Sequence, residues 1–375
     1  MNIGILILAA GNKAGGPEVY ETNILRALAA QDKQNTYHVF TTSEAAVEAC
    51  NVKQDNFIFH ILRPSLRVIN LSLTLPIWLR TQKIDVLHAT YVPPPQNVVP
   101  LVFSHHCFST FQHPEFYPPM VRLRLNYLIK HGLRTARRVL CVSDDVRQRT
   151  LERFGHPADR FEVIHHGVAT AFRPLDQAAC ARTVRERWGV DGPYLLTVGK
   201  LEKRKNFART LEAFARFRKS QGKDVRLVMA GKRTWHSAEL EKALDQSGVR
   251  DAVVETGYLG EADMACLYNA ATAFVFPSLW EGFGMPAVEA MACGTPVIAS
   301  NISSLPEVTG GNALLVDPYD VGAIENAMAR VCLDPLEARR LSDLGRAWAT
   351  QFTWQEAARK TLAAYHHAVE SSPVR

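Results

Sequence analysis

Short apolar runs rich in β-branched residues alternate with longer amphipathic stretches along almost the whole chain. Such a short run has the length of a strand buried on both faces, and the longer stretches repeat their apolar positions at helical spacing. The alternation indicates repeated β-α-β units, and therefore an α/β fold of parallel sheets covered by helices on both faces. The expected strands are residues 3–8, 36–41, 56–62, 85–88, 100–104, 138–142, 161–164, 194–198, 226–230, 252–256, 273–276, 296–299 and 313–316. The expected helices are residues 18–30, 71–82, 121–135, 144–154, 206–220, 237–247, 261–269, 286–293, 320–333, 336–351 and 353–369.

The length of the chain, 375 residues, indicates two domains, because single hydrophobic cores stop growing near about 250–300 residues. The α/β pattern is interrupted at residues 167–187, which we interpret as a charged connector containing proline. We therefore expect two Rossmann-like domains, residues 1–172 and 173–352. In open parallel sheets ligands bind beyond the carboxyl ends of the strands, so two facing domains would place a site between them.

Composition excludes several other classes of protein. With 47% hydrophobic and 21% charged residues, the chain is neither disordered nor fibrous. No apolar run approaches the roughly 18–20 residues that cross a bilayer, and the apolar N-terminus lacks the positive charge that opens a signal peptide. The seven cysteines form no Cys-x-x-Cys pair, so a reducing cytoplasm is expected rather than a disulfide framework. The net charge of +6 is a mild bias toward anionic partners.

A glycine-rich loop follows the first expected strand, with the sequence GNKAGGP at residues 11–17. A strand, a glycine turn and a helix N-terminus present free N–H groups and the positive end of the helix dipole to an anion. The alternative is a tight turn that only needs glycine backbone angles. The loop is not G-x-G-x-x-G, so nicotinamide binding is not supported.

The second domain opens with a basic loop, VGKLEKRKNF at residues 198–207. Lysine is a compact charge suited to phosphate, and Lys200 and Lys205 are the candidate ligands of a diphosphate. The alternative is a solvated basic loop.

Two carboxylates stand eight residues apart in the stretch FPSLWEGFGMPAVEAM, residues 276–291. Glu281 is expected in a loop after a strand, and Glu289 in the first turn of a helix that Pro286 opens. Gly282 and Gly284 let backbone amides approach a ligand, while the carboxylates accept hydrogen bonds from vicinal hydroxyls of a sugar or a ribose. A helix-dipole role for Glu289 is the alternative.

Together these segments resemble the retaining glycosyltransferases of family 4, which have the GT-B fold. The two glutamates match the E-x7-E motif of that family. The other matching segments are GG at 15–16, VS at 142–143, GKL and KN within 199–206, GYL at 257–259 and FTW at 352–354. The resemblance spans essentially the whole chain. It implies parallel sheets that face each other across a deep cleft, and a closing helix, residues 353–375, that packs back on the first domain.

The resemblance also implies roles for individual residues. Glu289 would hold the ribose of the donor nucleotide, Glu281 would lie at the donor sugar, and Lys200 and Lys205 would neutralise the diphosphate leaving group. The implied donor-binding residues are Gly15, Gly16, Lys200, Lys205, Glu281, Gly282, Phe283, Gly284, Met285 and Glu289, and the implied catalytic residues are His105, Lys205 and Glu281. No Asp-x-Asp motif occurs, so neither a metal ion nor another cofactor is expected, and the lysines take over the charge role of Mg²⁺.

A histidine pair follows the strand expected at residues 100–104. His105 matches the active-site histidine of the family, whereas His106 stands where the family usually has aspartate. Two alternatives remain for the pair: polar residues that merely end a strand, or a zinc site with Cys107 and His113, whose spacing fits no finger pattern. The later pair at residues 165–166 is expected only to shape the turn between the domains.

Residues 118–138 are basic and contain no acidic residue. An amphipathic helix of this charge can lie on an anionic membrane, and Arg122, Arg124, Lys130 and Arg134 are the membrane-facing candidates. The alternative is a helix with a core stripe and a solvated basic face. No nucleic-acid motif accompanies the charge, so no nucleic-acid partner is expected.

By this resemblance we expect an enzyme that moves a hexose from a nucleotide diphosphate sugar to a hydroxyl of a glycan or lipid-linked saccharide. Residues 200–206 and 305–308 are most similar to the mannosyltransferase-type branch that builds bacterial surface polysaccharides such as lipopolysaccharide, which favours GDP-mannose over uridine diphosphate sugars. The alternatives are a non-catalytic nucleotide-sugar or glycan binding protein, a sugar-nucleotide epimerase or glycan phosphorylase, and a nicotinamide oxidoreductase. The expected location is the cytoplasm, with peripheral attachment to the inner face of the membrane.

Overall fold

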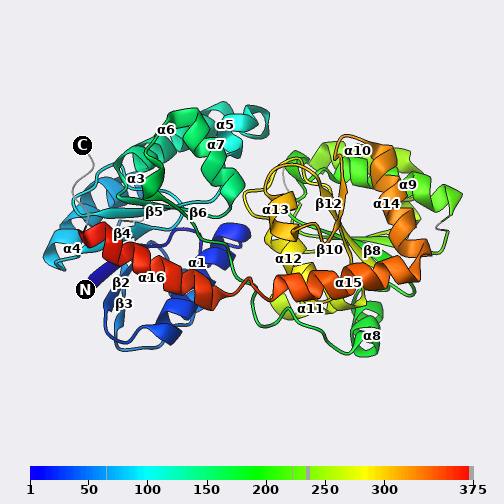
Figure 1. The fold of residues 1–375 in the computed structure, drawn as a ribbon, viewed down its shortest axis with the longest axis horizontal. Helices are drawn as coiled ribbons and strands as arrows, with labels where there is room; N and C mark the ends of the chain where they lie inside the picture. Colours follow the sequence, from blue (N-terminus) through cyan, green and yellow to red (C-terminus); the bar gives the residue numbers. More distant parts are fainter. Residues whose placement is uncertain (65, 222, 234–236, 371–375) are drawn as a thin grey trace. The chain divides into compact units, whose positions relative to one another are not determined.

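In the computed structural model the chain divides into two compact units (Figure 1). Unit 1 comprises Met1–Gly167 and the segment from Thr353 onward, and unit 2 comprises Val168–Phe352. The structure describes residues 1–64, 66–221, 223–233 and 237–370, so the end of the expected closing helix, residues 371–375, lies outside the described residues.

Unit 1 is built on a sheet of seven parallel strands in the order β3-β2-β1-β4-β5-β6-β7. The strands are β1 (Asn2–Leu6), β2 (Thr36–Thr41), β3 (Phe57–Ile61), β4 (Val86–Ala89), β5 (Leu101–His105), β6 (Arg138–Cys141) and β7 (Phe161–Val163). Strands β4 and β5 are buried along their whole length, because helices cover both faces of the sheet.

The helices of unit 1 include the closing helix of the chain. They are α1 (Gly16–Gln31), α2 (Glu44–Cys50), α3 (Arg67–Ile69), the π-helical turn η1 (Asn70–Thr74), α4 (Leu75–Thr81), α5 (Ser109–Gln112), η2 (Pro114–Phe116), α6 (Pro119–Thr135), α7 (Asp144–Phe154), η3 (Ala158–Arg160) and α16 (Trp354–Glu370). Helix α16 packs against α1 and against β4, β5 and β6. Its Tyr365 is fully buried, with the hydroxyl 2.7 Å from Nδ1 of His88 in β4. The end of the chain thus completes the core of the first unit.

Unit 2 is built on six parallel strands in the order β10-β9-β8-β11-β12-β13. The strands are β8 (Tyr194–Val198), β9 (Arg226–Ala230), β10 (Val253–Gly257), β11 (Ala273–Phe276), β12 (Val297–Ser300) and β13 (Leu314–Val316). Counted from the first strand of each unit, both sheets begin with the Rossmann order 3-2-1-4-5-6. The order reverses beside β1 in unit 1 and beside β8 in unit 2.

Helices cover both faces of the second sheet as well, with α9, α10 and α14 on one face and α8, α11 and α15 on the other (Figure 1). The helices of unit 2 are α8 (Gln177–Trp188), η4 (Lys203–Lys205), α9 (Phe207–Ser220), α10 (Ser237–Ser247), η5 (Arg250–Ala252), α11 (Glu261–Ala270), α12 (Met285–Ala292), α13 (Leu305–Thr309), α14 (Val321–Leu333) and α15 (Pro335–Ala349). Phe214, Phe217 and Met328 are fully buried members of the core between the sheet and the first of these layers.

All thirteen expected strands are confirmed, with ends within about two residues of the predicted ones. The interpretation of residues 167–187 as a connector is wrong in its second half, because α8 occupies Gln177–Trp188. Asp176 caps this helix by accepting hydrogen bonds from the N–H groups of Ala178 and Ala179, and Gly189 ends it in the left-handed region at φ 64°. The short helices α2, α5 and α13 were not expected, since so few turns carry little periodicity.

The helix expected at residues 71–82 is interrupted. A π-helical turn, Asn70–Thr74, precedes α4, in which Pro76 lacks an N–H group and crowds the carbonyl four residues earlier. Among the residues that the structure describes, none of the helices combines the length and hydrophobicity needed to cross a membrane.

Candidate active site

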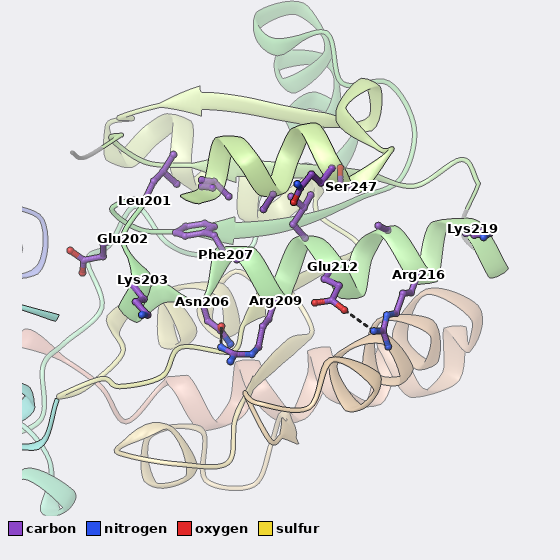
Figure 2. A pocket seen from close by; sticks show the side chains of 16 residues that line it. Leu201, Glu202, Lys203, Asn206, Phe207, Arg209, Glu212, Arg216, Lys219 and Ser247 are labelled. Carbon is purple, nitrogen blue, oxygen red and sulfur yellow. Dashed lines mark hydrogen bonds and ion pairs between the residues drawn. The ribbon is translucent and has the colours of Figure 1, made fainter. Parts of the chain in front are cut away.

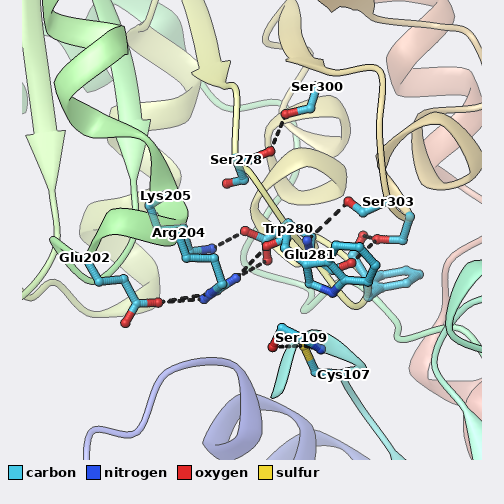
Figure 3. A network of polar contacts seen from close by, with 12 residues as sticks. Cys107, Ser109, Glu202, Arg204, Lys205, Ser278, Trp280, Glu281, Ser300 and Ser303 are labelled. Atoms are coloured by element: carbon cyan, nitrogen blue, oxygen red, sulfur yellow. Dashed lines mark hydrogen bonds and ion pairs between the residues drawn. The ribbon is translucent and has the colours of Figure 1, made fainter. Parts of the chain in front are cut away.

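The loops after β8 and β11 meet where the strand order of unit 2 reverses, which is the place where Rossmann-type sheets bind ligands. The first loop ends in η4 and carries Lys205, and the second carries Glu281. Lys205 Nζ lies 2.6 Å from Glu281 Oε1, and both residues are buried, at 9% and 6% exposure (Figure 3). Two residues separated by 76 positions are therefore joined by a direct ion pair at this edge of the sheet.

A second cation contacts the same carboxylate. Arg204 Nη1 lies 3.1 Å from Glu281 Oε2, so each oxygen of Glu281 faces a different positive charge. Burial by itself raises the pKa of Glu281, but Lys205 and Arg204 outweigh burial and the pKa is lowered. Burial lowers the pKa of Lys205, and Glu281 opposes this shift. Glu281 is thus held as a carboxylate by two cations.

Side chains from neighbouring loops hold the segment around Glu281 in place. The Glu281 N–H donates to Ser303 Oγ at 3.2 Å, and Ser304 Oγ donates to the carbonyl oxygens of Glu281 and Phe283 at 3.1 and 3.0 Å. Gly284 adopts φ 94°, where a Cβ atom would lie 2.6 Å from the Leu305 side chain. This glycine is required both by its backbone angle and by the close packing of α13.

Asn206 fixes the other loop. It adopts a left-handed conformation at φ 58° directly after η4, and its side-chain amide donates to the carbonyl oxygens of Pro277 and Pro318 at 2.9 and 2.7 Å. The N–H of Leu279 donates to the carbonyl of Arg204 at 2.8 Å. The two ligand loops are therefore bound to each other through both backbone and side chains.

Lys200 stands apart from this network. It is exposed at the end of β8, next to Gly199, whose carbonyl oxygen lies only 1.8 Å from where a Cβ atom on Gly231 would be. Sequence reasoning missed Gly231, although it directly follows β9 in the sequence VMAGK. Only glycine permits the ends of β8 and β9 to cross this closely.

Glu289 lies beyond the first turn of α12, because the helix begins at Met285 rather than at Pro286, and its expected place in the first turn is wrong. The Tyr268 hydroxyl donates to Glu289 Oε2 at 3.2 Å. Burial raises the pKa of Glu289 to about 7, although the Tyr268 hydrogen bond acts in the opposite direction. A helix-dipole role does not describe this partly buried carboxylate, which is paired with a buried tyrosine.

In unit 1, the glycine-rich loop at residues 11–17, which was expected to bind an anion, is bound by a carboxylate of the protein itself. Helix α1 begins at Gly16, preceded by Gly15 at φ 76°. The Glu18 carboxylate accepts hydrogen bonds from the N–H groups of Gly11 and Ala14, at 3.0 and 2.7 Å. Two N–H groups of the loop are therefore already bonded before any ligand enters.

A second glutamate of α1 anchors the start of the same loop. Glu21 is fully buried and accepts hydrogen bonds from the N–H groups of Leu8, Ala9 and Ala10 and from the Thr90 hydroxyl, at 2.7–3.0 Å. Burial raises the pKa of Glu21 in spite of these bonds. Sequence reasoning missed both glutamates, although their spacing of three residues at the start of a helix was visible.

His105 ends β5 and is 1% exposed. Burial lowers the pKa of His105 to about 3, so its imidazole is neutral near pH 7. Its Nε2 atom and Thr110 Oγ1 have no hydrogen-bond partner among the described residues, and both side chains line a cavity of about 40 Å³, which is large enough for a water molecule. The partly exposed His106 donates from Nε2 to the Thr90 carbonyl at 2.5 Å, and burial lowers its pKa to about 4. Both imidazoles are therefore neutral at pH 7, and neither is an imidazolium that could act as a general acid.

The zinc alternative for this region has no support in the geometry. Within the described ranges, no group of three or more His, Cys, Asp or Glu side chains is arranged to hold a metal ion. In the later histidine pair, His166 is buried and packs against the rings of Tyr20 and Trp354, at centroid distances of 5.0 and 5.7 Å.

A groove of about 690 Å³ lies between α9 and α10 of unit 2 (Figure 2). Its walls include Phe207, Leu211 and Leu240 together with the exposed cations of α9. Neither Lys205 nor Glu281 lines it, so it is separate from the paired charges described above.

Comparison with known proteins gives the family. Residues 14–172 match the family model Glycosyltransferase Family 4, and residues 183–348 match the model Glycosyl transferases group 1. The O-antigen chain mannosyltransferase B of Escherichia coli is 32% identical over 291 residues, which cover 76% of this chain and 75% of that protein. This chain is a family 4 glycosyltransferase.

The glycosyltransferase is also similar to the serotype-specific mannosyltransferase WbdA of Escherichia coli, at 30% identity over 62% of this chain, but that match covers only 29% of WbdA. Among solved structures, Anabaena Alr3699/HepE in complex with UDP and glucose superposes with a TM-score of 0.76 at 19% identity, covering 96% of this chain and 99% of that one. The expected family, GT-B fold and enzyme class of the glycosyltransferase are thereby confirmed.

Proposed function

We propose that this glycosyltransferase moves mannose, with retention of configuration, from GDP-mannose to a hydroxyl of a glycan or lipid-linked saccharide in the synthesis of a bacterial surface polysaccharide. Two of the relatives described above are named mannosyltransferases, one of them of the O-antigen chain. The observation that carries the proposal is the buried pair Lys205–Glu281, on the two loops at the strand-order reversal of unit 2.

In the proposed reaction the bond between the anomeric carbon and the diphosphate breaks, and negative charge develops on the leaving group. Lys200 and Lys205 stabilise that charge, while Glu289 accepts hydrogen bonds from the ribose hydroxyls and Glu281 from the sugar. The acceptor hydroxyl attacks the oxocarbenium-like sugar on the same face, and the departing phosphate takes its proton. In this scheme Gly15 and Gly16 contact the donor with their backbone, as do Gly282, Phe283, Gly284 and Met285.

This scheme leaves no proton transfer for His105, which agrees with its neutral, buried imidazole. It also disfavours a covalent glycosyl-enzyme on Glu281. Both oxygens of that carboxylate face cations, and a carboxylate stabilised in this way is a weaker nucleophile. We therefore assign His105 a hydrogen-bonding role at the donor sugar and Glu281 an electrostatic one.

A uridine diphosphate sugar is the second candidate donor, because the similar Anabaena structure holds UDP and glucose. The deciding experiment is a thermal-shift panel of GDP-mannose, UDP-glucose and other nucleotide sugars, with and without EDTA. A donor at about 100 times its Kd stabilises the fold by about 2.7 kcal/mol. Stabilisation by GDP-mannose alone, undiminished by EDTA, supports the proposal. Stabilisation by UDP sugars alone would show that the donor is a UDP sugar and not GDP-mannose. No response to any nucleotide sugar of the panel contradicts the proposal that the protein uses such a donor.

We further propose that α6 lies on an anionic membrane surface. Met120, Leu123 and Tyr127 are spaced along one stripe of this helix and are 65–78% exposed, while Arg124, Lys130 and Arg134 are exposed beside them. Only the second half of the helix, around Ile129 and Leu133, is buried in unit 1. An exposed apolar stripe flanked by cations is the pattern of an interfacial helix.

A further inference from the structure

Arg204 stands in the basic loop of unit 2, but its charge is directed at the protein. Its guanidinium Nη1 lies 3.1 Å from Glu281 Oε2 and donates to the Trp280 carbonyl at 2.8 Å. On its other side, Nε and Nη2 donate to Glu202 Oε1 at 3.1 and 2.8 Å (Figure 3). One side chain therefore binds three acceptors from two different loops.

Glu281 depends on this contact for one of its two oxygens. Lys205 binds Oε1 at 2.6 Å, and Arg204 binds Oε2. The backbone at Glu281 is fixed separately by Ser303 and Ser304. With the backbone fixed and one oxygen held, Arg204 decides the remaining rotation of the carboxylate about its terminal bond.

Lysine cannot make the same arrangement. Guanidinium spreads five donors in a rigid planar fork, whereas an ammonium group has its three donors on one atom. The acceptors of Arg204 lie on opposite sides of that fork, since Glu202 is bound through Nε and Nη2 and Trp280 through Nη1.

We propose that Arg204 is a positioning residue of the transfer reaction, which orients the Glu281 carboxylate toward the donor sugar and keeps Lys205 from pairing with it through both oxygens. The proposal rests on the proposed function. It adds a residue that touches neither diphosphate nor sugar in the scheme above and acts only through Glu281.

The test compares Arg204→Met and Arg204→Lys with Arg216→Met, which removes an exposed arginine–glutamate pair elsewhere in unit 2. Steady-state transfer is measured with the donor that the thermal-shift panel selects. Because misplacing a group that contacts substrate by about 1 Å can cost about 100-fold, we expect kcat to fall on the order of 10- to 100-fold in Arg204→Met. Partial recovery in Arg204→Lys and no change in Arg216→Met are expected. Guanidinium ion, added well below denaturing concentration, should restore part of the activity of Arg204→Met and none of that of Lys205→Ala.

The pH profile separates positioning from a merely structural role. The charged groups that face Glu281 are Lys205 and Arg204. Loss of Arg204 should raise the pKa of Glu281, so the fall of kcat on the acidic side of the pH–rate profile (the acidic limb) should move to higher pH. In Arg204→Lys the acidic limb should stay near its wild-type pH. Activity that falls only in proportion to the melting temperature, with an unmoved limb, overturns the proposal, as does wild-type kcat in Arg204→Met. Absence of transfer by the wild-type protein overturns the proposed function itself, whereas an active wild type with an unaffected Arg204→Met overturns only this inference.

Discussion

At the scale of single residues, the structure assigns different states to groups that look alike in the sequence. Lys203 and Lys205 are two positions apart, but Lys203 is exposed and Lys205 is buried against Glu281 with its ammonium group 4.6 Å from the Phe276 ring centroid. Glu281 and Glu289 are likewise eight positions apart, but the pKa is lowered at Glu281 and raised at Glu289. Burial together with the nearest charge decides each state.

Lys205→Ala is expected to lower kcat by about 100-fold or more, because the variant lacks the positive charge that stabilises the negative charge developing on the diphosphate leaving group. Lys203→Ala is the matched control, since it removes an exposed lysine from the same turn. Transfer assays on both variants, with melting temperatures measured alongside, check this. Equal turnover in the two variants would remove Lys205 from the mechanism.

Donor affinity is expected to depend on the ionisation of Glu289. Its carboxylate is needed to accept bonds from the ribose hydroxyls, and its pKa of about 7 means that it is neutral below that pH. The Kd of the intact nucleotide sugar, whose esterified diphosphate does not titrate in this range, should rise up to about tenfold from pH 8 to pH 6. Glu289→Gln should make this profile flat. A donor analogue without ribose hydroxyls should bind the wild-type protein with little pH dependence, and a steep profile for that analogue would refute the assignment.

The ionisation of Glu289 should affect the stability of the ligand-free protein in the direction opposite to its effect on donor affinity. Because the folded protein raises the pKa of Glu289 above its unfolded value, the neutral form stabilises the ligand-free fold at low pH. That contribution is lost as the pH rises through about 7. Affinity and stability therefore move in opposite directions across the same pH range.

At the scale of elements, α6 carries an apolar stripe that the rest of unit 1 does not bury. The basic side chains Arg122, Arg124, Lys130 and Arg134 of the same helix form no ion pair with the described residues of unit 1. Reversing the charge at Arg122 and Arg124 to glutamate should release the protein from anionic vesicles, since each basic residue near the lipid contributes about 1 kcal/mol. Arg182→Glu with Arg185→Glu, exposed on α8 of unit 2, makes the same change in net charge and should leave binding unaltered. Equal vesicle partitioning of the two double variants would leave α6 as an ordinary solvated helix.

At the scale of the whole molecule, the chain finishes its first unit with its last helix. Tyr365 and Trp354 of α16 are buried in unit 1, and α16 packs on α1 and three strands. Deleting the residues from 353 onward should therefore destabilise unit 1 while leaving unit 2, whose core does not include α16, folded. Hydrogen exchange on the truncated protein should show loss of protection in β4–β6 but not in β8–β12. Uniform protection in both units would show that α16 is dispensable.

Periodicity and motif order were sufficient to predict the thirteen strands, the α/β class and the family, since these depend on residues near one another in the chain. The short helices α2, α5 and α13 were not predicted, because a few residues contain too little periodicity. Helix α8 was missed for a different reason. Its cap at Asp176 and its terminal Gly189 were visible, but the proline and charges before them favoured a connector.

For the candidate site, the sequence alone determined which loops carry the charged residues, because β-α-β order places every such loop at the carboxyl edge of a parallel sheet. Only the tertiary structure decided which side chains meet. It paired Arg204 with Glu281, bonded two N–H groups of the glycine loop to Glu18, and made His105 neutral. The reason is physical: an ion pair or a pKa depends on burial and on neighbours tens of residues away, and no local pattern encodes either.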